Sequence, residues 1–215
     1  MNIKNNRKIR SFDYPYRYLI KEDFFTNNII EYISKNNENF YHASDKASKV
    51  LNNKKLSNKR NIIRLIEKNK VKLNKNKKID KFSKILQKFL KKKINGDFYR
   101  NLKLKENLRK KGFLNVTLCW DKPGYSMKPH TDTTRKIWTG LIYLFGNGNG
   151  VGGTTMLIKD TKKKLKKFKK INPKINRLFA FKRTDISYHC VDKSNANRIM
   201  LMLNYNYKNR YFNEK

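Results

Sequence analysis

The stretch GYSMKPHTD, residues Gly124–Asp132, carries the pattern His-x-Asp. Successive side chains of a β-strand point to opposite faces, so that residues i and i+2 share one face. His130 and Asp132 can therefore present an imidazole nitrogen and a carboxylate oxygen to one cation. His189, in the later β-rich run Ser187–Val191, is the candidate for a third ligand of the same cation.

Taken alone, a His-x-Asp pattern is weak, because a surface histidine beside a turn aspartate gives the same letters. Two histidines and one carboxylate on one face leave the other coordination positions of a metal open. This donor set is typical of non-haem Fe(II) sites. The sequence around the three residues therefore decides between a metal site and a surface pair.

Arg198 begins the last long β-rich run, nine residues after His189. The face it shares with Met200, Met202 and Asn204 is otherwise largely apolar. Burial of a guanidinium there is costly unless it meets an anion, and a dicarboxylate ligand would supply one through bidentate geometry. Tyr143 lies on the inward face of another run, and we expect its hydroxyl to be a second donor to that carboxylate.

The two halves of the chain differ in pattern. Short β-rich runs separated by turn signals predict a sandwich, barrel or jelly roll; they are residues 113–120, 137–145, 154–158, 177–181, 187–191 and 198–207. The basic run 162–170 reads as a surface loop or edge segment. Residues 1–112 read as mostly helical, with helices over 24–33, 62–66 and 79–90, an edge strand over 16–20 and a long loop over 36–60.

With these motifs in order, residues 113–207 resemble the 2-oxoglutarate/Fe(II)-dependent oxygenases, nearest to their prolyl-hydroxylase-like branch. The resemblance rests on Gly124–Asp132, Thr139–Leu144, Asn176–Phe181, His189 and Arg198. It implies an α+β fold with a double-stranded β-helix (jelly-roll) core over residues 113–215. It also implies flanking helices in a variable N-terminal part, residues 1–112, that packs on the core within one structural domain.

The resemblance also implies roles for the motif residues. His130, Asp132 and His189 become the iron ligands and catalytic centre, and Arg198 and Tyr143 bind the distal carboxylate of 2-oxoglutarate. The implied cofactors are Fe(II), 2-oxoglutarate as co-substrate and O2, with ascorbate as an optional reductant. The implied reaction hydroxylates a C–H bond of an amino acid, a peptide (prolyl-type) or a small metabolite, and it releases succinate and CO2.

Two alternatives remain open: a nucleic-acid demethylase or base hydroxylase of the same superfamily, and a non-catalytic jelly-roll interaction protein. Halogenating relatives replace the carboxylate ligand with a small residue, whereas Asp132 is present here. Nucleic-acid demethylases usually carry a second arginine six residues after the first, whereas that position here is Asn204.

The chain of 215 residues has 53 Lys and Arg against 16 Asp and Glu, a formal charge of +37. A basic surface attracts nucleic acid, so we expect non-specific polyanion binding. The charge is spread over both halves and accompanies abundant Asn and Ile and scarce Pro and Gly, as a low-GC genome would produce. The sequence shows no secretory signal or apolar run of membrane-spanning length, and two cysteines form no disulfide framework. These features predict a cytoplasmic protein.

Overall fold

The computed structural model describes residues 8–50, 58–94, 98–145 and 150–208. Thirteen strands lie in these ranges: β1 (Arg10–Phe12), β2 (Tyr18–Lys21), β3 (Asp45–Lys46), β4 (Arg60–Glu67), β5 (Lys70–Val71), β6 (Gly112–Asp121), β7 (Met127–His130), β8 (Lys136–Phe145), β9 (Thr154–Lys159), β10 (Leu165–Ile171), β11 (Leu178–Lys182), β12 (His189–Val191) and β13 (Arg198–Tyr207). The helices are α1 (Asn27–His42), α2 (Ala47–Val50), α3 (Lys77–Lys93), α4 (Tyr99–Asn101) and α5 (Glu106–Lys111).

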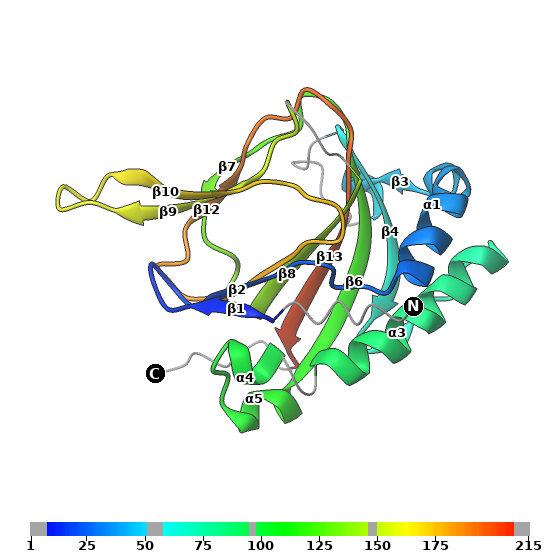
Figure 1. The fold of residues 1–215 in the computed structure, drawn as a ribbon, viewed down its shortest axis with the longest axis horizontal. Helices are drawn as coiled ribbons and strands as arrows, with labels where there is room; N and C mark the ends of the chain where they lie inside the picture. The colour runs from blue at the N-terminus through cyan, green and yellow to red at the C-terminus, as the bar shows by residue number, and fades with distance from the viewer. Residues whose placement is uncertain (1–7, 51–57, 95–97, 146–149, 209–215) are drawn as a thin grey trace.

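The strands form two antiparallel sheets (Figure 1). The large sheet has the order β1-β2-β11-β8-β13-β6-β4-β3, with β5 paired to β4, and the small sheet has the order β10-β9-β12-β7. Side chains from both sheets line one cavity between them. The expected α+β class with a jelly-roll core is confirmed, and neither sheet closes on itself.

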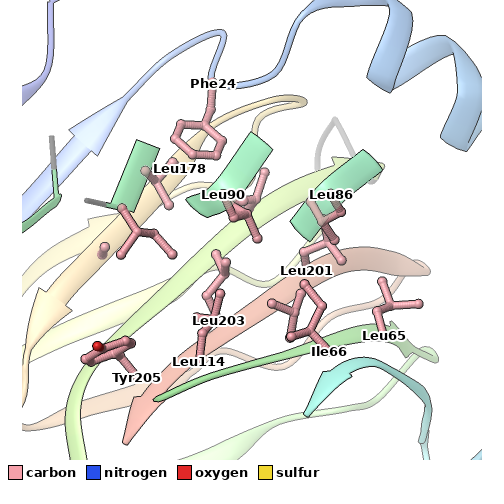
Figure 2. Packing of buried hydrophobic residues seen from close by; sticks show 14 of the residues in the cluster. Phe24, Leu65, Ile66, Leu86, Leu90, Leu114, Leu178, Leu201, Leu203 and Tyr205 are labelled. Atoms are coloured by element: carbon pink, nitrogen blue, oxygen red, sulfur yellow. The ribbon is translucent and has the colours of Figure 1, made fainter. Parts of the chain in front are cut away.

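Helices α1 and α3 cover the outer face of the large sheet (Figure 1). Helix α3 places buried apolar side chains at helical spacing, among them Phe82, Leu86 and Leu90. Asn76 caps this helix by accepting a hydrogen bond from the Lys78 amide at 2.9 Å. Figure 2 shows Leu86 and Leu90 above side chains of the sheet, including Leu201 and Leu203 of β13, so this layer is the main hydrophobic core.

The side chains of β13 separate the two faces of the large sheet. Leu201 and Leu203 point to the helix-covered core, whereas Met200 belongs to a second apolar cluster on the inner face. Arg198 and Met202 line the inner cavity. The alternation expected from the sequence is therefore confirmed, and it turns the functional face of this strand away from the helices.

The prediction of a helix over residues 62–66 is wrong, because these residues lie in β4, which pairs with β6. Ile63 and Leu65 face the helices while Ile62 faces the inner cluster. A strand buried on both faces reads as a continuous apolar run, which periodicity cannot distinguish from a helix.

Two other expectations change in part, and a third is confirmed. Residues 36–60 are not one long loop, because α1 extends to His42 and β3 and α2 follow it. The strand expected over 16–20 is β2, which lies between β1 and β11 and is not the edge. The basic run is the edge strand β10, whose side chains are exposed except at Ile171.

Strands β1 to β5 belong to the same large sheet as β6, β8, β11 and β13. The division of the chain at residue 112 stays a prediction. In the described ranges, no helix is both long enough and apolar enough to cross a membrane.

Candidate active site

A cavity of about 340 Å³ lies between the inner faces of the two sheets. This volume lies at the lower end of the range for ligand pockets, roughly 300–1,000 Å³. Strands β4, β6, β8 and β13 of the large sheet supply one wall, and His130, Thr154 and His189 of the small sheet belong to the other. The cavity therefore contains all three residues that the sequence predicts as metal ligands.

His130 ends β7 and His189 begins β12, and the two residues are paired across these antiparallel strands. Their ring centroids lie 4.4 Å apart. Asp132 follows β7 by two residues and is buried. One potential ligand atom from each of the three residues lies within 4.8 Å of the others, so the predicted triad converges in space.

Backbone carbonyls fix the tautomers of both histidines. Nδ1 of His130 lies 2.8 Å from the carbonyl oxygen of Lys128, and Nδ1 of His189 lies 3.0 Å from that of Ser187. A carbonyl oxygen only accepts, so each Nδ1 carries a proton, and in the neutral imidazole Nε2 is then the atom with the lone pair for a metal. Burial lowers the pKa of His189 to about 4, although the charge of Asp132 acts in the opposite direction. The low pKa keeps this imidazole neutral.

Two neighbours hold the Asp132 carboxylate. Lys136 Nζ lies 2.6 Å from Oδ1, and Thr139 donates its hydroxyl to Oδ2 at 2.6 Å. Burial favours the protonated acid, but the charge of Lys136 and these hydrogen bonds outweigh it and lower the pKa of Asp132. The carboxylate is thus kept ionised in a buried position.

The three residues fit a divalent metal of the Fe(II) type. Two imidazole Nε2 atoms and one carboxylate oxygen converge on one cavity wall, and the open cavity leaves room for further ligands. The contacts at Nδ1 orient the rings as second-layer hydrogen bonds do in metal sites. Iron bound there would supply the oxygen chemistry of the site.

Arg198 lies at the closed end of the cavity and is 1% exposed. Its Nε and Nη2 contact Oδ2 of Asp121 at 3.1 Å and 2.5 Å, and its Nη1 donates to the carbonyl oxygen of Gly152. The expectation that Arg198 requires an external anion is therefore incomplete, because Asp121 already pairs with it. A guanidinium has five N–H donors, so two remain for a ligand carboxylate.

The sequence-based interpretation missed Arg60 of β4. Its Nε and Nη2 contact Oδ1 and Oδ2 of Asp121 at 2.5 Å and 2.9 Å, and its guanidinium lies 4.1 Å from the ring centroid of Tyr125. Arg60, Asp121 and Arg198 thus form a buried cluster with two positive charges and one negative charge. Asp121 directly follows the predicted run 113–120. Its position two residues after Cys119 places both side chains on one face, and this spacing was the signal in the sequence for an inward carboxylate.

Tyr143 is fully buried beside the cavity and does not line it. Its hydroxyl lies 3.1 Å from the Thr154 hydroxyl, which does line the cavity. Burial raises the pKa of Tyr143, although Arg198 and Thr154 oppose this effect. The structure therefore brings Arg198 and the three predicted ligands to one cavity, and it places Tyr143 behind Thr154.

Comparison with known proteins agrees with this donor set. Residues 114–206 match the family described as the 2OG-Fe(II) oxygenase superfamily. The match covers less than half of the chain, over the part that carries the three predicted ligands. The enzymes of this family use Fe(II), 2-oxoglutarate and O2, so the match agrees with an oxygenase that depends on 2-oxoglutarate and Fe(II). A search of curated proteins gave no match.

Solved structures with the same fold include prolyl hydroxylases. One is a prolyl-4-hydroxylase from Pseudomonas putida, with 13% identity, a TM-score of 0.56 and coverage of 89% of this chain and 93% of that one. Another is a prolyl hydroxylase from Trichoplax adhaerens in complex with a peptide fragment of hypoxia inducible factor, with 18% identity, a TM-score of 0.60 and coverage of 89% and 84%. At these identities the likeness shows the fold.

A third similar structure is a non-haem α-ketoglutarate-dependent epimerase of nogalamycin biosynthesis. It is 10% identical, with a TM-score of 0.52 and coverage of 87% of this chain and 76% of that one. The same fold therefore carries hydroxylation and epimerisation, and the reaction type must be argued from the site.

Proposed function

We propose that this oxygenase is a hydroxylase that inserts oxygen into a C–H bond of an amino acid, a peptide or a small metabolite, with release of succinate and CO2. The observation that carries the proposal is the convergence of His130, Asp132 and His189 in a cavity whose closed end holds Arg198. The proposal assigns the three residues as iron ligands and Arg198 as the main binder of the distal carboxylate of 2-oxoglutarate.

Each residue has a defined task in this proposal. Arg198 fixes one end of 2-oxoglutarate, so that the other end reaches the metal ligands. Tyr143 contributes through Thr154, whose hydroxyl faces the cavity. The apolar inner cluster around Met156, Phe179 and Phe181 excludes water from this end, which strengthens the charge interactions inside it.

The carboxylate at position 132 supports hydroxylation over halogenation. Both oxygens of Asp132 are held by neighbours, and the side chain is buried. A halide would need the space of this side chain, which Thr139 and Lys136 keep in place. Asn204, whose Oδ1 lies 3.4 Å from the Thr139 hydroxyl, stands where a demethylase would carry its second arginine.

The test is the formation of succinate from 2-oxoglutarate by the purified protein with and without Fe(II). Wild type should form succinate only with iron, and a panel of amino acids, peptides and metabolites should stimulate it. Asp132→Ala should abolish both iron binding and turnover. Asp45→Ala is the matched control, because Asp45 does not line the cavity, its side chain is 43% exposed and it pairs with Lys49 at 2.7 Å. Equal iron affinity in wild type and Asp132→Ala would refute the assignment of the ligands.

Non-specific binding to polyanions remains an expectation from the charge of +37. The exposed lysines of β10, in the hairpin that projects from the body of the molecule (Figure 1), support it. Binding to a single-stranded oligonucleotide should then weaken steeply with salt. A product formed on a methylated oligonucleotide would favour the nucleic-acid branch instead.

A further inference from the structure

The pairing of strands divides the cavity wall into rows that differ in polarity. The row Arg60, Asp121 and Arg198 carries the buried charges, and the next row, Ile62, Cys119 and Met200, is apolar. Beyond it lie Arg64, Thr117 and Met202, and then Asn115, Asn204 and Thr139. A polar zone therefore lies on the other side of an apolar band from Arg198.

This polar zone is also the open end of the cavity. The side chains of Arg64 and Glu67 are 32% and 33% exposed, whereas those of Arg198 and Asp121 are 1% and 0% exposed. If 2-oxoglutarate takes the closed end, the substrate enters past Arg64 and Glu67. The chemistry of these two side chains then selects the substrate.

The open end carries charges of both signs close together. Arg64 Nη1 lies 2.7 Å from Glu67 Oε1, and both residues line the cavity. Lys72 approaches the second oxygen of Glu67 at 3.4 Å. A half-exposed ion pair stabilises a fold by only about 0–1 kcal/mol, so a charged ligand can compete for either partner at little cost in stability.

The pair has capacity for a ligand with the reverse arrangement of charges. A guanidinium has five N–H donors and binds a carboxylate through two of them. A carboxylate such as Glu67 has about four lone-pair sites, so it can accept further hydrogen bonds from an ammonium group. Asn115 and Asn204 add amide groups to the same wall. A free α-amino acid carries its carboxylate and ammonium on one carbon and fits this arrangement.

The volume of the cavity also favours a small substrate. A cavity of about 340 Å³ must hold 2-oxoglutarate as well as the reacting part of the substrate. The space that remains suits a molecule of a few heavy atoms, and its charged head group would sit at the open end. A residue inside a polypeptide has its α-carboxyl and α-amino groups in peptide bonds, so it has no α-carboxylate for Arg64 and no α-ammonium for Glu67.

We propose that the substrate is a free α-amino acid, whose carboxylate is bound by Arg64 and whose ammonium is bound by Glu67. The amino-acid side chain then points toward His130, Asp132 and His189, which lie at the same end of the cavity, because Asp132 is hydrogen-bonded to Thr139 of the polar zone. This inference rests on the proposed function for the direction of the substrate. A peptidyl residue is the competing substrate, and the test separates the two.

The test measures binding and not only turnover. The protein is loaded with Fe(II) and 2-oxoglutarate under nitrogen, and each of the free L-amino acids is compared with its Nα-acetyl amide by ligand-observed NMR and calorimetry. We expect at least one free amino acid to bind, and its blocked form to bind at least roughly tenfold more weakly. Absence of binding by every free amino acid, or equal binding of the blocked form, would overturn the proposal.

Two variants test the assigned residues. Arg64→Gln and Glu67→Gln should each weaken binding of the free amino acid by roughly 10- to 100-fold, as expected for the loss of a hydrogen bond to a charged group. Arg10→Gln is the matched control, because Arg10 lies on β1, is 62% exposed and pairs only loosely with Glu22 at 3.5 Å. Circular dichroism and unfolding midpoints establish that the variants are folded. Equal affinity in Arg64→Gln and Arg10→Gln would refute the assignment.

Failure of this inference is distinguishable from failure of the proposed function. If only peptides stimulate succinate formation, the hydroxylase proposal stands and the amino-acid proposal falls. If a free amino acid binds through Arg64 but yields no oxidised product and no succinate, the recognition site stands and the proposed reaction falls.

Discussion

Replacement of Arg60 by methionine tests whether the N-terminal part of the chain contributes to the anion site. Methionine keeps an unbranched apolar side chain and removes the guanidinium. The variant loses both contacts to Asp121, at 2.5 Å and 2.9 Å, and the stacking over Tyr125 at 4.1 Å. The charge of the cluster formed by Arg60, Asp121 and Arg198 falls from +1 to zero.

Two separate effects follow from this change. Removal of one partner from a buried ion pair usually costs about 3–5 kcal/mol. Asp121 keeps Arg198 as a partner, so we expect a loss near the lower end, about 3 kcal/mol. For the co-substrate, two unit charges about 8 Å apart at an effective dielectric constant of about 20 interact by about 2 kcal/mol. This value corresponds to an affinity for 2-oxoglutarate that is weaker by roughly 30-fold.

Urea unfolding measures the first effect, and calorimetric titration with 2-oxoglutarate in the presence of Fe(II) under nitrogen measures the second. Arg60→Lys retains the charge but not the two-pronged geometry, so it should lose stability while keeping most of the affinity. Arg10→Met, at an exposed site, should change the free energy of unfolding by less than about 0.5 kcal/mol. An Arg60→Met protein with the affinity of Arg10→Met would refute the shared anion site.

Three further predictions concern the core, the cavity and the thiols. Leu86→Ala empties a site that is 0% exposed and should lower the free energy of unfolding by about 2–5 kcal/mol in urea titrations; a change under about 1 kcal/mol would contradict this packing. Gly152→Ala places a Cβ against the carbonyl oxygen of Asp192 and disturbs the carbonyl that accepts from Arg198. This variant should lose about 1–3 kcal/mol and bind 2-oxoglutarate more weakly, and unchanged affinity would contradict it. Burial raises the pKa of Cys119 to about 12, so at pH 8 its thiolate is scarce; iodoacetamide should modify Cys190 first, as mass spectrometry of the native protein would show.

The metal motif was predictable because its residues are close in the sequence or flanked by clear strand patterns. His130 and Asp132 are separated by one residue, and the strand patterns beside His189 and Arg198 are strong. The face alternation of β13 is set by its side chains alone. These features can be predicted without knowing which strands pair with each other.

The partners of these residues were not predictable in the same way. Asp121 meets Arg60 and Arg198 because β6 lies between β4 and β13 in one register. That register depends on contacts between residues about 60 and 77 positions apart in the chain. The reading of 62–66 as a helix then removed Arg60 and Arg64 from the set of inward side chains.

The place of β13 in the large sheet has a consequence for the biogenesis of the protein. This strand is inserted between β8 and β6, which are both synthesised earlier. Until β13 emerges from the ribosome, its two neighbours present open edges that invite pairing with other chains. A chain that ends before residue 198 would therefore expose two unpaired strand edges, the kind of surface that makes incomplete chains prone to aggregate.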